Sequence, residues 1–459
     1  MRGAREVAQR VLSRVRDGAR LAWIFGDRVG DRTVLRYVVS DEGGLEEHPG
    51  NVLGPVPSLA AELPAALWHE CEARDRFGIL FEDLPESRPL VDVRPAEELR
   101  RAESPEVSTV LYGPIRSGIV ESARWIVETA GEDFISVHPS MFFKRRELEH
   151  RFTGVPLDLA AHVAEHASGA TASSHAAAFS KAAEAALRLE VPERARATRA
   201  VLVEFERIHQ HLDSLAKLAD DGSLSVGSSQ TFAAKERIHR LLAEATGNRF
   251  ARGVITVGGT RFDAMSRLAD VCGAQLDRLE AEVLAVLEAL FSTQSLLDRL
   301  IGTGRLAREV VIAYGAVGPV ARGSGVSCDA RLRDGYLYTP MAGEESLESQ
   351  GDAVSRALVR RAEIVRSFRS IRNALDGAFA GEHLAPARIE DGCGIARVES
   401  PQGELLYFVR FDGGIARVAL RSASYANWPL FVPSLPGNIF TDFSFIEHSF
   451  GLSQAEVDR

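Results

Sequence analysis

Apolar and polar residues recur with two different spacings along the chain, and these spacings predict its elements. Near the start, Val7, Val11 and Val15 repeat every four residues, as on one face of a helix. The segments LAWIF (21–25) and VLRYVV (34–39) then predict two strands around the Gly- and Asp-rich turn GDRVGDR. The chain is therefore predicted to begin with a small α+β unit.

A charged stretch with three prolines, ESRPLVDVRPAEELRRAESPEVS, follows this unit and places a domain boundary near residues 95–108. We therefore divide the chain into a first domain, 1–105, and a second domain, 106–459. The second domain opens with YGPIRSGIVESARWIVETAGEDFISVHP, whose alternation predicts a pair of strands.

A long helical tract makes up the middle of the second domain. One helix is predicted to begin near Pro192, a second to end near Gly247, a third to cover residues 263–300 and a fourth to cover 349–377. The third carries an apolar stripe at steps of three and four residues, formed by Leu276, Leu279, Val283, Val286 and Leu290. Four such helices predict a bundle.

Strand-like text returns near the end of the chain, in GIARVES, GELLYFVRFDGG and IARVALRSAS. The fold class predicted for the whole chain is α+β. A small N-terminal α+β domain is followed by a mainly helical-bundle domain with flanking antiparallel sheets.

Composition narrows the possible functions. With 45% hydrophobic and 26% charged residues, the 459-residue chain has ample material for buried cores. The net charge of −10 argues against binding nucleic acid or anionic lipid through the surface as a whole. Cys71, Cys272, Cys328 and Cys393 lie too far apart in sequence to form a metal clip, and four cysteines do not indicate a disulfide scaffold. No apolar run approaches the ~20 residues of a membrane span, so a cytoplasmic chain linked to a membrane only through partners is expected.

Several segments carry candidate chemistry, each with a simpler interpretation beside it. HVAEH (162–166) places two histidines on one helix face and could hold zinc, although surface or core histidines are the favoured interpretation. GVITVGG (253–259) does not match the G-x-G-x-x-G nucleotide loop. In CEARDRFGILFEDLPESRPL (71–90), Glu72 and Asp75 could act as acid and base, but the neighbouring arginines favour ion pairs.

Two parts of the chain resemble known proteins. CEARDRFGILFEDLPESRPL resembles the signature of the C subunit of bacterial NADH:quinone oxidoreductase, the respiratory complex I. VPERARATRAVLVEFERIHQHL, ATGNRFARGVITVGG, RGSGVSCDAR, PGNIFTDFSFIEHSFG and EVDR resemble the D subunit of that complex and, equally, the large subunit of membrane-bound, energy-converting [NiFe] hydrogenases. A fusion of C and D in this order is typical of the formate hydrogenlyase type.

The resemblance also shows where a metal centre would lie. In the hydrogenases, the segment similar to 168–175 reads C-G-x-C-x-x-x-H, and a second C-x-x-C near the end completes the four thiolates that hold nickel and iron. This chain has Ser168 and Thr171 in the first pair, Ser453 and Glu456 in the second, and keeps His175. Nickel in such a centre needs soft, deprotonated sulfur, and hydroxyl groups are hard ligands that stay protonated. We therefore expect neither nickel nor hydrogenase activity.

Quinone chemistry of the usual kind is also not expected. The two histidine positions that the resemblance implies fall at Arg116 and Val120, and the tyrosine that partners the quinone headgroup falls at Gly169. Glu149, with Arg145 or Arg146 as its neighbouring arginine, resembles a proton-gate glutamate. The residues that we expect to line the cavity or relay protons are Glu149, His175, Arg322, Asp329 and Arg331.

The resemblance implies a large peripheral-arm subunit of a complex-I-like membrane oxidoreductase or ion-translocating complex, with the nickel site lost. A quinone- or other substrate-reducing subunit with a remodelled pocket is the alternative, and a non-catalytic scaffold is a second. The implied partners are a small iron–sulfur protein similar to the B subunit of complex I, antiporter-like membrane proteins and a protein similar to the H subunit. The iron–sulfur cluster would belong to the neighbouring protein and this chain would bind no cofactor. It would lie at the cytoplasmic face of the membrane and bind no nucleic acid.

Overall fold

The computed structural model describes residues 2–42, 44–86, 88–91, 106–116, 121–333, 345–377 and 379–459. Most of the predicted boundary near 95–108 lies outside these residues, so the division at 105/106 stays a prediction.

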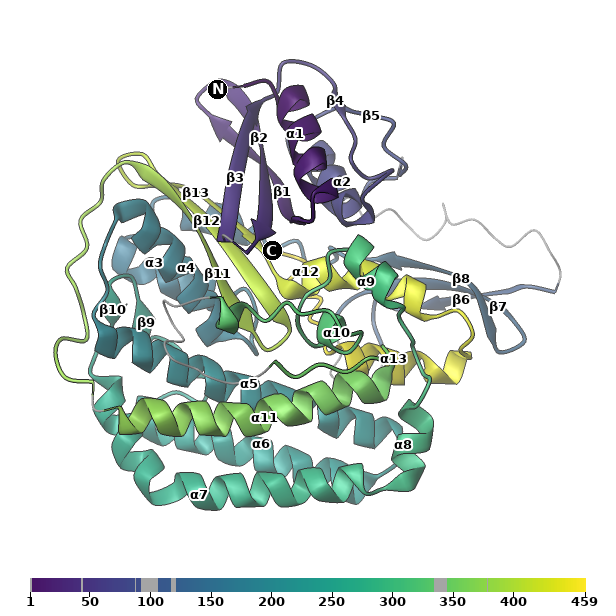
Figure 1. Cartoon of the computed structure of the whole chain (residues 1–459), viewed down its shortest axis with the longest axis vertical. Coiled ribbons are helices and arrows are strands. Elements are labelled where there is room, and N and C mark those ends of the chain that lie inside the picture. Colours follow the sequence, from purple (N-terminus) through teal and green to yellow (C-terminus); the bar gives the residue numbers. More distant parts are fainter. Residues whose placement is uncertain are drawn as a thin grey trace.

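The N-terminal unit is a three-stranded antiparallel sheet covered by two helices (Figure 1). Val7 and Val11 are fully buried against the sheet, where they meet Leu35 and Tyr37, so the predicted helix face is confirmed. The elements are α1 (Ala4–Arg16), β1 (Arg20–Val29), β2 (Arg32–Asp41), β3 (Gly44–Asn51), β4 (Val56–Pro57), α2 (Leu67–Phe77) and β5 (Phe81–Glu82).

Four long helices form the predicted bundle at the opposite end of the molecule (Figure 1). They are α5 (Glu193–Asp221), α6 (Ser225–Thr246), α7 (Ala264–Phe291) and α11 (Ala353–Asp376). Gly247 ends α6 in the left-handed conformation, at φ 82°, which glycine adopts without strain. The shorter helices are α3 (Leu157–Ala164), α4 (Ala172–Leu187), α8 (Gln294–Leu300), α9 (Arg308–Ala313), α10 (Gly318–Arg322), α12 (Ala423–Asn427) and α13 (Phe443–Phe450).

The single helix predicted over 263–300 is wrong at its end. Helix α7 stops at Phe291 and a separate helix, α8, begins at Gln294. The hydroxyls of Ser292 and Thr293 both donate to the carbonyl of Ala289, so side chains satisfy a carbonyl that the next turn of helix would have used.

A second antiparallel sheet, formed by β11 (Gly392–Ser400), β12 (Gly403–Phe411) and β13 (Ile415–Arg421), lies between the two units (Figure 1). Its central strand is apolar on both faces. Tyr407 packs toward α4, where it meets Phe179, and Phe408 packs toward the N-terminal sheet, where it meets Phe25. The N-terminal unit is therefore joined to the second domain through a packed double sheet.

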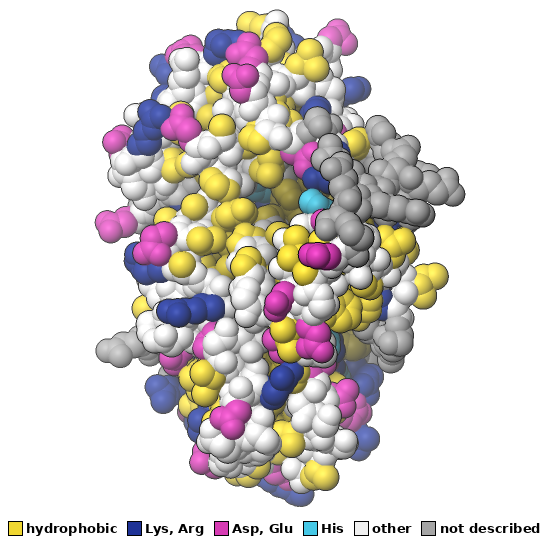
Figure 2. All heavy atoms as spheres, turned by 90° about the vertical axis from the view of Figure 1, so that its right-hand side faces the viewer, with side chains coloured by type: hydrophobic (Ala, Val, Ile, Leu, Met, Phe, Trp, Pro, Cys, Tyr) yellow, Lys and Arg dark blue, Asp and Glu magenta, His cyan; other side chains and the backbone are white. Residues whose placement is uncertain are grey.

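A third sheet carries apolar side chains exposed at the surface. Its strands are β6 (Ser108–Tyr112), β7 (Arg124–Ala130) and β8 (Asp133–Ser140), the last two being the predicted strand pair. Leu111 and Ile135 are more than half exposed, and Ile115, just after β6, is almost wholly exposed. Figure 2, which views the right-hand side of Figure 1, shows hydrophobic side chains gathered around a hollow on this side of the molecule.

Candidate functional site

Two of the positions that the resemblance assigns to hydrogenase cysteines, Thr171 and Glu456, meet at one buried place in the fold. Thr171 precedes the first turn of α4, and Glu456 lies in the segment after α13. The Thr171 hydroxyl donates to Glu456 Oε1 at 2.7 Å, and the Ser424 hydroxyl donates to Glu456 Oε2 at 2.7 Å. His175 contributes both ring nitrogens, with Nε2 3.6 Å from Glu456 Oε1 and Nδ1 2.8 Å from the Tyr407 hydroxyl.

Glu456 is ionised in this setting. Burial opposes its charge, but the nearby His175 ring and the hydrogen bonds from Thr171 and Ser424 outweigh burial and lower its pKa. A carboxylate with its own donors thus occupies the position where the resemblance places a metal-bound thiolate.

The other two ligand positions point to different partners. Ser453 donates from its hydroxyl to Glu121 Oε2 at 2.9 Å, and Ser168 accepts from the amide of Ala170 at 3.3 Å. Among the described residues, no group of three or more His, Cys, Asp or Glu side chains could hold a metal ion. The hydroxyls at these positions are protonated and hard, so this donor set does not fit nickel.

Glu206 lies beside this cluster, on α5. Its carboxyl group accepts from the amides of Ser173 at 2.7 Å and Ser174 at 3.0 Å, and it contacts the Ser174 hydroxyl. Sequence reasoning missed Glu206, Tyr407 and Ser424. The one available signal was a glutamate at an otherwise apolar position of the α5 pattern, in VLVEFERIHQHL.

Glu149 lies in a separate cluster that joins the two domains. It forms ion pairs with Arg417 at 2.9 Å and Arg459 at 3.1 Å, and it accepts from the amide of Leu420. Arg459 in turn pairs with Glu72 of the N-terminal unit at 2.7 Å. Burial alone would raise the pKa of Glu149, but the surrounding arginines lower it to about 2. Glu149 also lines a cavity of about 400 Å³.

The arginines that pair with Glu149 are not the ones predicted. Arg145 pairs with Glu147, two residues away. Arg146 donates to the carbonyls of His166 and Ala167. Sequence proximity is a poor guide here because the true partner, Arg459, lies 310 residues along the chain from Glu149.

Arg322, Asp329 and Arg331 form part of a fully buried ion-pair network. Arg322 binds Glu399 at 2.8 Å and Glu363 at 2.6 Å, and Arg331 binds Asp329 at 2.7 Å. The two arginines hold the pKa of Asp329 well below its usual range in spite of its burial. Burial raises the pKa of Glu399 to about 7, which Arg322 opposes.

Helix α5 carries glutamates into both clusters. Glu204 pairs with Arg331 at 3.3 Å, whereas Glu206, two residues further along, binds the start of α4. Residues two apart on a helix point in different directions. The network of Arg322, Asp329 and Arg331 therefore lies on another face of α5 from the cluster of His175 and Glu456.

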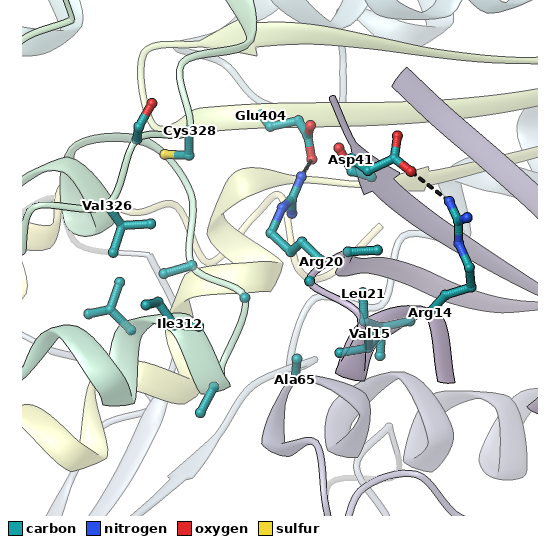
Figure 3. Close-up of a pocket in the computed structure, with 18 of the residues that line it drawn as sticks. Arg14, Val15, Arg20, Leu21, Asp41, Ala65, Ile312, Val326, Cys328 and Glu404 are labelled. Atoms are coloured by element: carbon teal, nitrogen blue, oxygen red, sulfur yellow. Dashed lines mark hydrogen bonds and ion pairs between the residues drawn. The ribbon is translucent and has the colours of Figure 1, made fainter. Parts of the chain in front are cut away.

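A cavity of about 810 Å³ lies between the N-terminal unit and the second domain (Figure 3). Arg20 reaches across from the N-terminal unit to Glu404 at 2.5 Å, and Ile312 and Cys328 line the second domain's side. Burial raises the pKa of the Cys328 thiol to about 12, so the thiol is neutral and a poor nucleophile.

Other candidate residues have structural partners. Arg116 makes a two-pronged ion pair with Glu447, at 2.7 and 2.8 Å, whereas Val120 lies outside the described residues. Gly169 is exposed, and its carbonyl accepts from Arg252. His162 of the HVAEH segment pairs with Glu165 at 2.6 Å.

The carboxylates predicted to form ion pairs near residue 75 do form them. Glu72 pairs with Arg76 at 2.9 Å, and Asp75 pairs with Arg74 at 2.8 Å. The favoured interpretation of this segment is confirmed.

Two segments of the chain match models of known families. The profile of the "Respiratory-chain NADH dehydrogenase, 30 Kd subunit" matches residues 47–100, and that of the "Respiratory-chain NADH dehydrogenase, 49 Kd subunit" matches residues 222–390. The chain therefore carries, in this order, one segment similar to each of the two subunits.

Individual relatives place the chain more closely. Formate hydrogenlyase subunit 5 of Escherichia coli is 27% identical over 489 aligned positions, covering 97% of this chain and 85% of that protein. The membrane-bound hydrogenase subunit alpha of Pyrococcus furiosus is 29% identical and covers 72% of this chain and 82% of its own length. The D subunit of the NADH-quinone oxidoreductase of Thermosipho melanesiensis is also 29% identical, over 61% of this chain and 80% of that protein. The chain is thus similar to subunits of complex-I-like and hydrogenase membrane complexes, in agreement with the resemblance of its sequence motifs.

A solved structure shares the fold. One chain of an archaeal respiratory membrane complex, the membrane-bound sulfane sulfur reductase, superposes with a TM-score of 0.72 at 24% identity, covering 78% of this chain and all of that chain. In the described part of the present chain, we find no helix with the length and apolar character needed to span a bilayer.

Proposed function

We propose that this chain is the large peripheral-arm subunit of a complex-I-like membrane oxidoreductase or ion-translocating complex, and that it works without nickel. One observation carries the second part of the proposal. Where the resemblance implies the nickel of the hydrogenases, the Glu456 carboxylate accepts hydrogen bonds from Thr171 and Ser424 and lies against His175. The residues that replace the thiolates are therefore bonded to one another or to neighbouring protein groups.

The chemistry available to such a site is the movement of protons and charge. Glu456, His175 and Tyr407 are all buried and connected through contacts of 2.8 to 3.6 Å. In a low-dielectric interior, a charge that appears nearby acts strongly on such groups. The site would respond to an electron or proton arriving in a neighbouring subunit and pass the response to the rest of the complex.

The proposed partners are the small iron–sulfur protein, which would hold the cluster, and membrane proteins of the antiporter-like kind and of the kind of the H subunit of complex I. The relatives named above include subunits of membrane complexes, which supports this proposal. The exposed apolar residues on and beside the β6–β8 sheet, such as Leu111 and Ile115, also support it, because burial against another subunit would remove them from water. The chain would then lie at the cytoplasmic face of the membrane.

Gentle purification of the tagged chain from membranes tests the proposal. We expect an iron–sulfur protein and membrane proteins to copurify with it, and nickel to be far below one atom per chain. Leu111→Asp should weaken copurification. Leu53→Asp, which changes a side chain 88% exposed in the N-terminal unit, is the matched control and should leave copurification unchanged. A chain purified alone, or one with stoichiometric nickel, would contradict the proposal.

A further inference from the structure

Glu206 differs from the other buried glutamates of the bundle and the adjoining sheet. It is 2% exposed, and its three hydrogen-bond donors all come from Ser173 and Ser174, in the first turn of α4. Those other glutamates each have an arginine against them, and so does Glu184 on α4. Glu184 lies 2.6 Å from Arg199, for example.

The same pairing holds for Glu404 with Arg421 at 2.5 Å and for Glu363 with Arg322 at 2.6 Å. Within the described ranges, Glu206 has no ion pair to an arginine, lysine or histidine within 4.0 Å. Its local environment therefore lacks the cation that normally keeps a buried carboxyl group ionised.

The charged group that acts on Glu206 from outside its own helix is another carboxylate, Glu456. Burial raises the pKa of Glu206, the donors of Ser174 and Ser173 lower it, and the negative charge of Glu456 raises it again, to about 8 overall. Of the titratable groups around this place, α4 contributes His175, β12 contributes Tyr407 and the segment after α13 contributes Glu456. The His175 and Tyr407 contacts are directed at Glu456 and at each other.

We propose that Glu206, which is held by Ser173 and Ser174 and has no cation beside it among the described residues, holds a proton at neutral pH. Glu206 is thus a buried store of one proton close to the cluster of His175 and Glu456. Its role in coupling rests on the proposed function, but its protonation does not.

Infrared spectroscopy of the full chain at pH 7 tests this proposal. A protonated carboxyl group has a carbonyl stretching band that a carboxylate lacks. We expect Glu206→Gln to remove one carboxyl group's share of that band while the protein stays folded, because a glutamine amide can replace a neutral acid. Glu184→Gln is the matched control: its carboxylate is paired with Arg199, so the band should persist in full.

A second variant keeps the proposal testable if Glu206→Gln does not fold. Ser174→Ala removes a hydroxyl that contacts the Glu206 carboxyl group, so the Glu206 band should move to higher frequency. A band that is identical in wild type, Glu206→Gln and Ser174→Ala would overturn the proposal. The proposal would also be overturned if Glu206→Gln were unfolded at pH 7 and the band of Ser174→Ala were unshifted. That combination would indicate that folding requires Glu206 as a carboxylate. These spectra need no partner subunit. They can therefore contradict the protonation of Glu206 while copurification supports the proposed function, or support the protonation while copurification fails.

Discussion

Replacing Arg322 with methionine should strongly destabilise the second domain. Arg322 is fully buried on α10, and its guanidinium group holds Glu399 at 2.8 Å and Glu363 at 2.6 Å. Methionine fills a similar volume but carries no charge. Glu363 would keep its hydrogen bond with His211 at 2.9 Å. Among the described residues, the carboxyl group of Glu399 would keep one hydrogen bond, from the amide of Ala330 at 3.1 Å.

The magnitude follows from what remains at Glu399. Removing one partner from a buried ion pair costs roughly 3–5 kcal/mol, because the other charge stays buried without compensation. The pKa of Glu399 is already about 7 with Arg322 present. Without the guanidinium group, Glu399 would take up a proton, which limits the loss. We therefore expect a decrease of about 3 kcal/mol in the free energy of unfolding at pH 7, and a smaller decrease at lower pH.

Urea unfolding followed by tryptophan fluorescence measures this effect. Arg361→Met is the matched control, because Arg361 pairs with Glu288 at 2.9 Å on the surface and such pairs contribute about 0–1 kcal/mol. Adding Glu399→Gln to Arg322→Met should restore part of the stability, since it removes the uncompensated carboxyl group. The reasoning is refuted if Arg322→Met lies within about 1 kcal/mol of the wild type, or if the surface variant costs as much.

Three other predictions test different parts of the structure. The pKa of Glu149 is about 2 in the folded chain against an ordinary value of 4.5, so it contributes stability that is fully present above pH 4.5 and is lost as the pH falls toward 2. That contribution is about 3 kcal/mol, at 1.36 kcal/mol for each pKa unit. Arg417→Met should make the free energy of unfolding fall less between pH 5 and pH 2, as unfolding curves over that range would show. Phe408→Ala should cost roughly 3–5 kcal/mol and loosen the packing of the N-terminal unit in limited proteolysis; unchanged proteolysis would argue against the double sheet as the joint. Gly318→Ala should prevent stable folding, since a Cβ there would overlap a backbone carbonyl. Its control is Gly273→Ala, on an open face of α7, which should stabilise the chain by up to about 1 kcal/mol. Thermal melts measure both effects.

Much of the fold could be predicted from local pattern. The stripe on α7 is an example: Leu276, Leu279, Val283 and Leu290 are buried as predicted, and Val286 is half-buried. The break after Phe291 was missed because hydroxyl groups that bond back to a carbonyl end a helix without changing its apolar spacing.

The candidate site was harder to predict. His175 and Glu456 could be found because they occupy motif positions. Glu206 could not, because a glutamate in a helix is usually a surface residue, and only packing shows that this one is buried without a cation.

The sequence by itself determined which elements form and which residue types occupy the positions that the resemblance assigns to metal ligands. Periodicity depends on residues a few positions apart, and the identity of a ligand depends on one residue, so both can be obtained from the chain alone. Only the tertiary structure decided the electrostatic state of each carboxyl group. The pKa of Glu149 is low because folding brings Arg417 and Arg459 to it from hundreds of positions away. The pKa of Glu206 is raised because folding buries this side chain, and the charge of Glu456, 250 positions along the chain, raises it further.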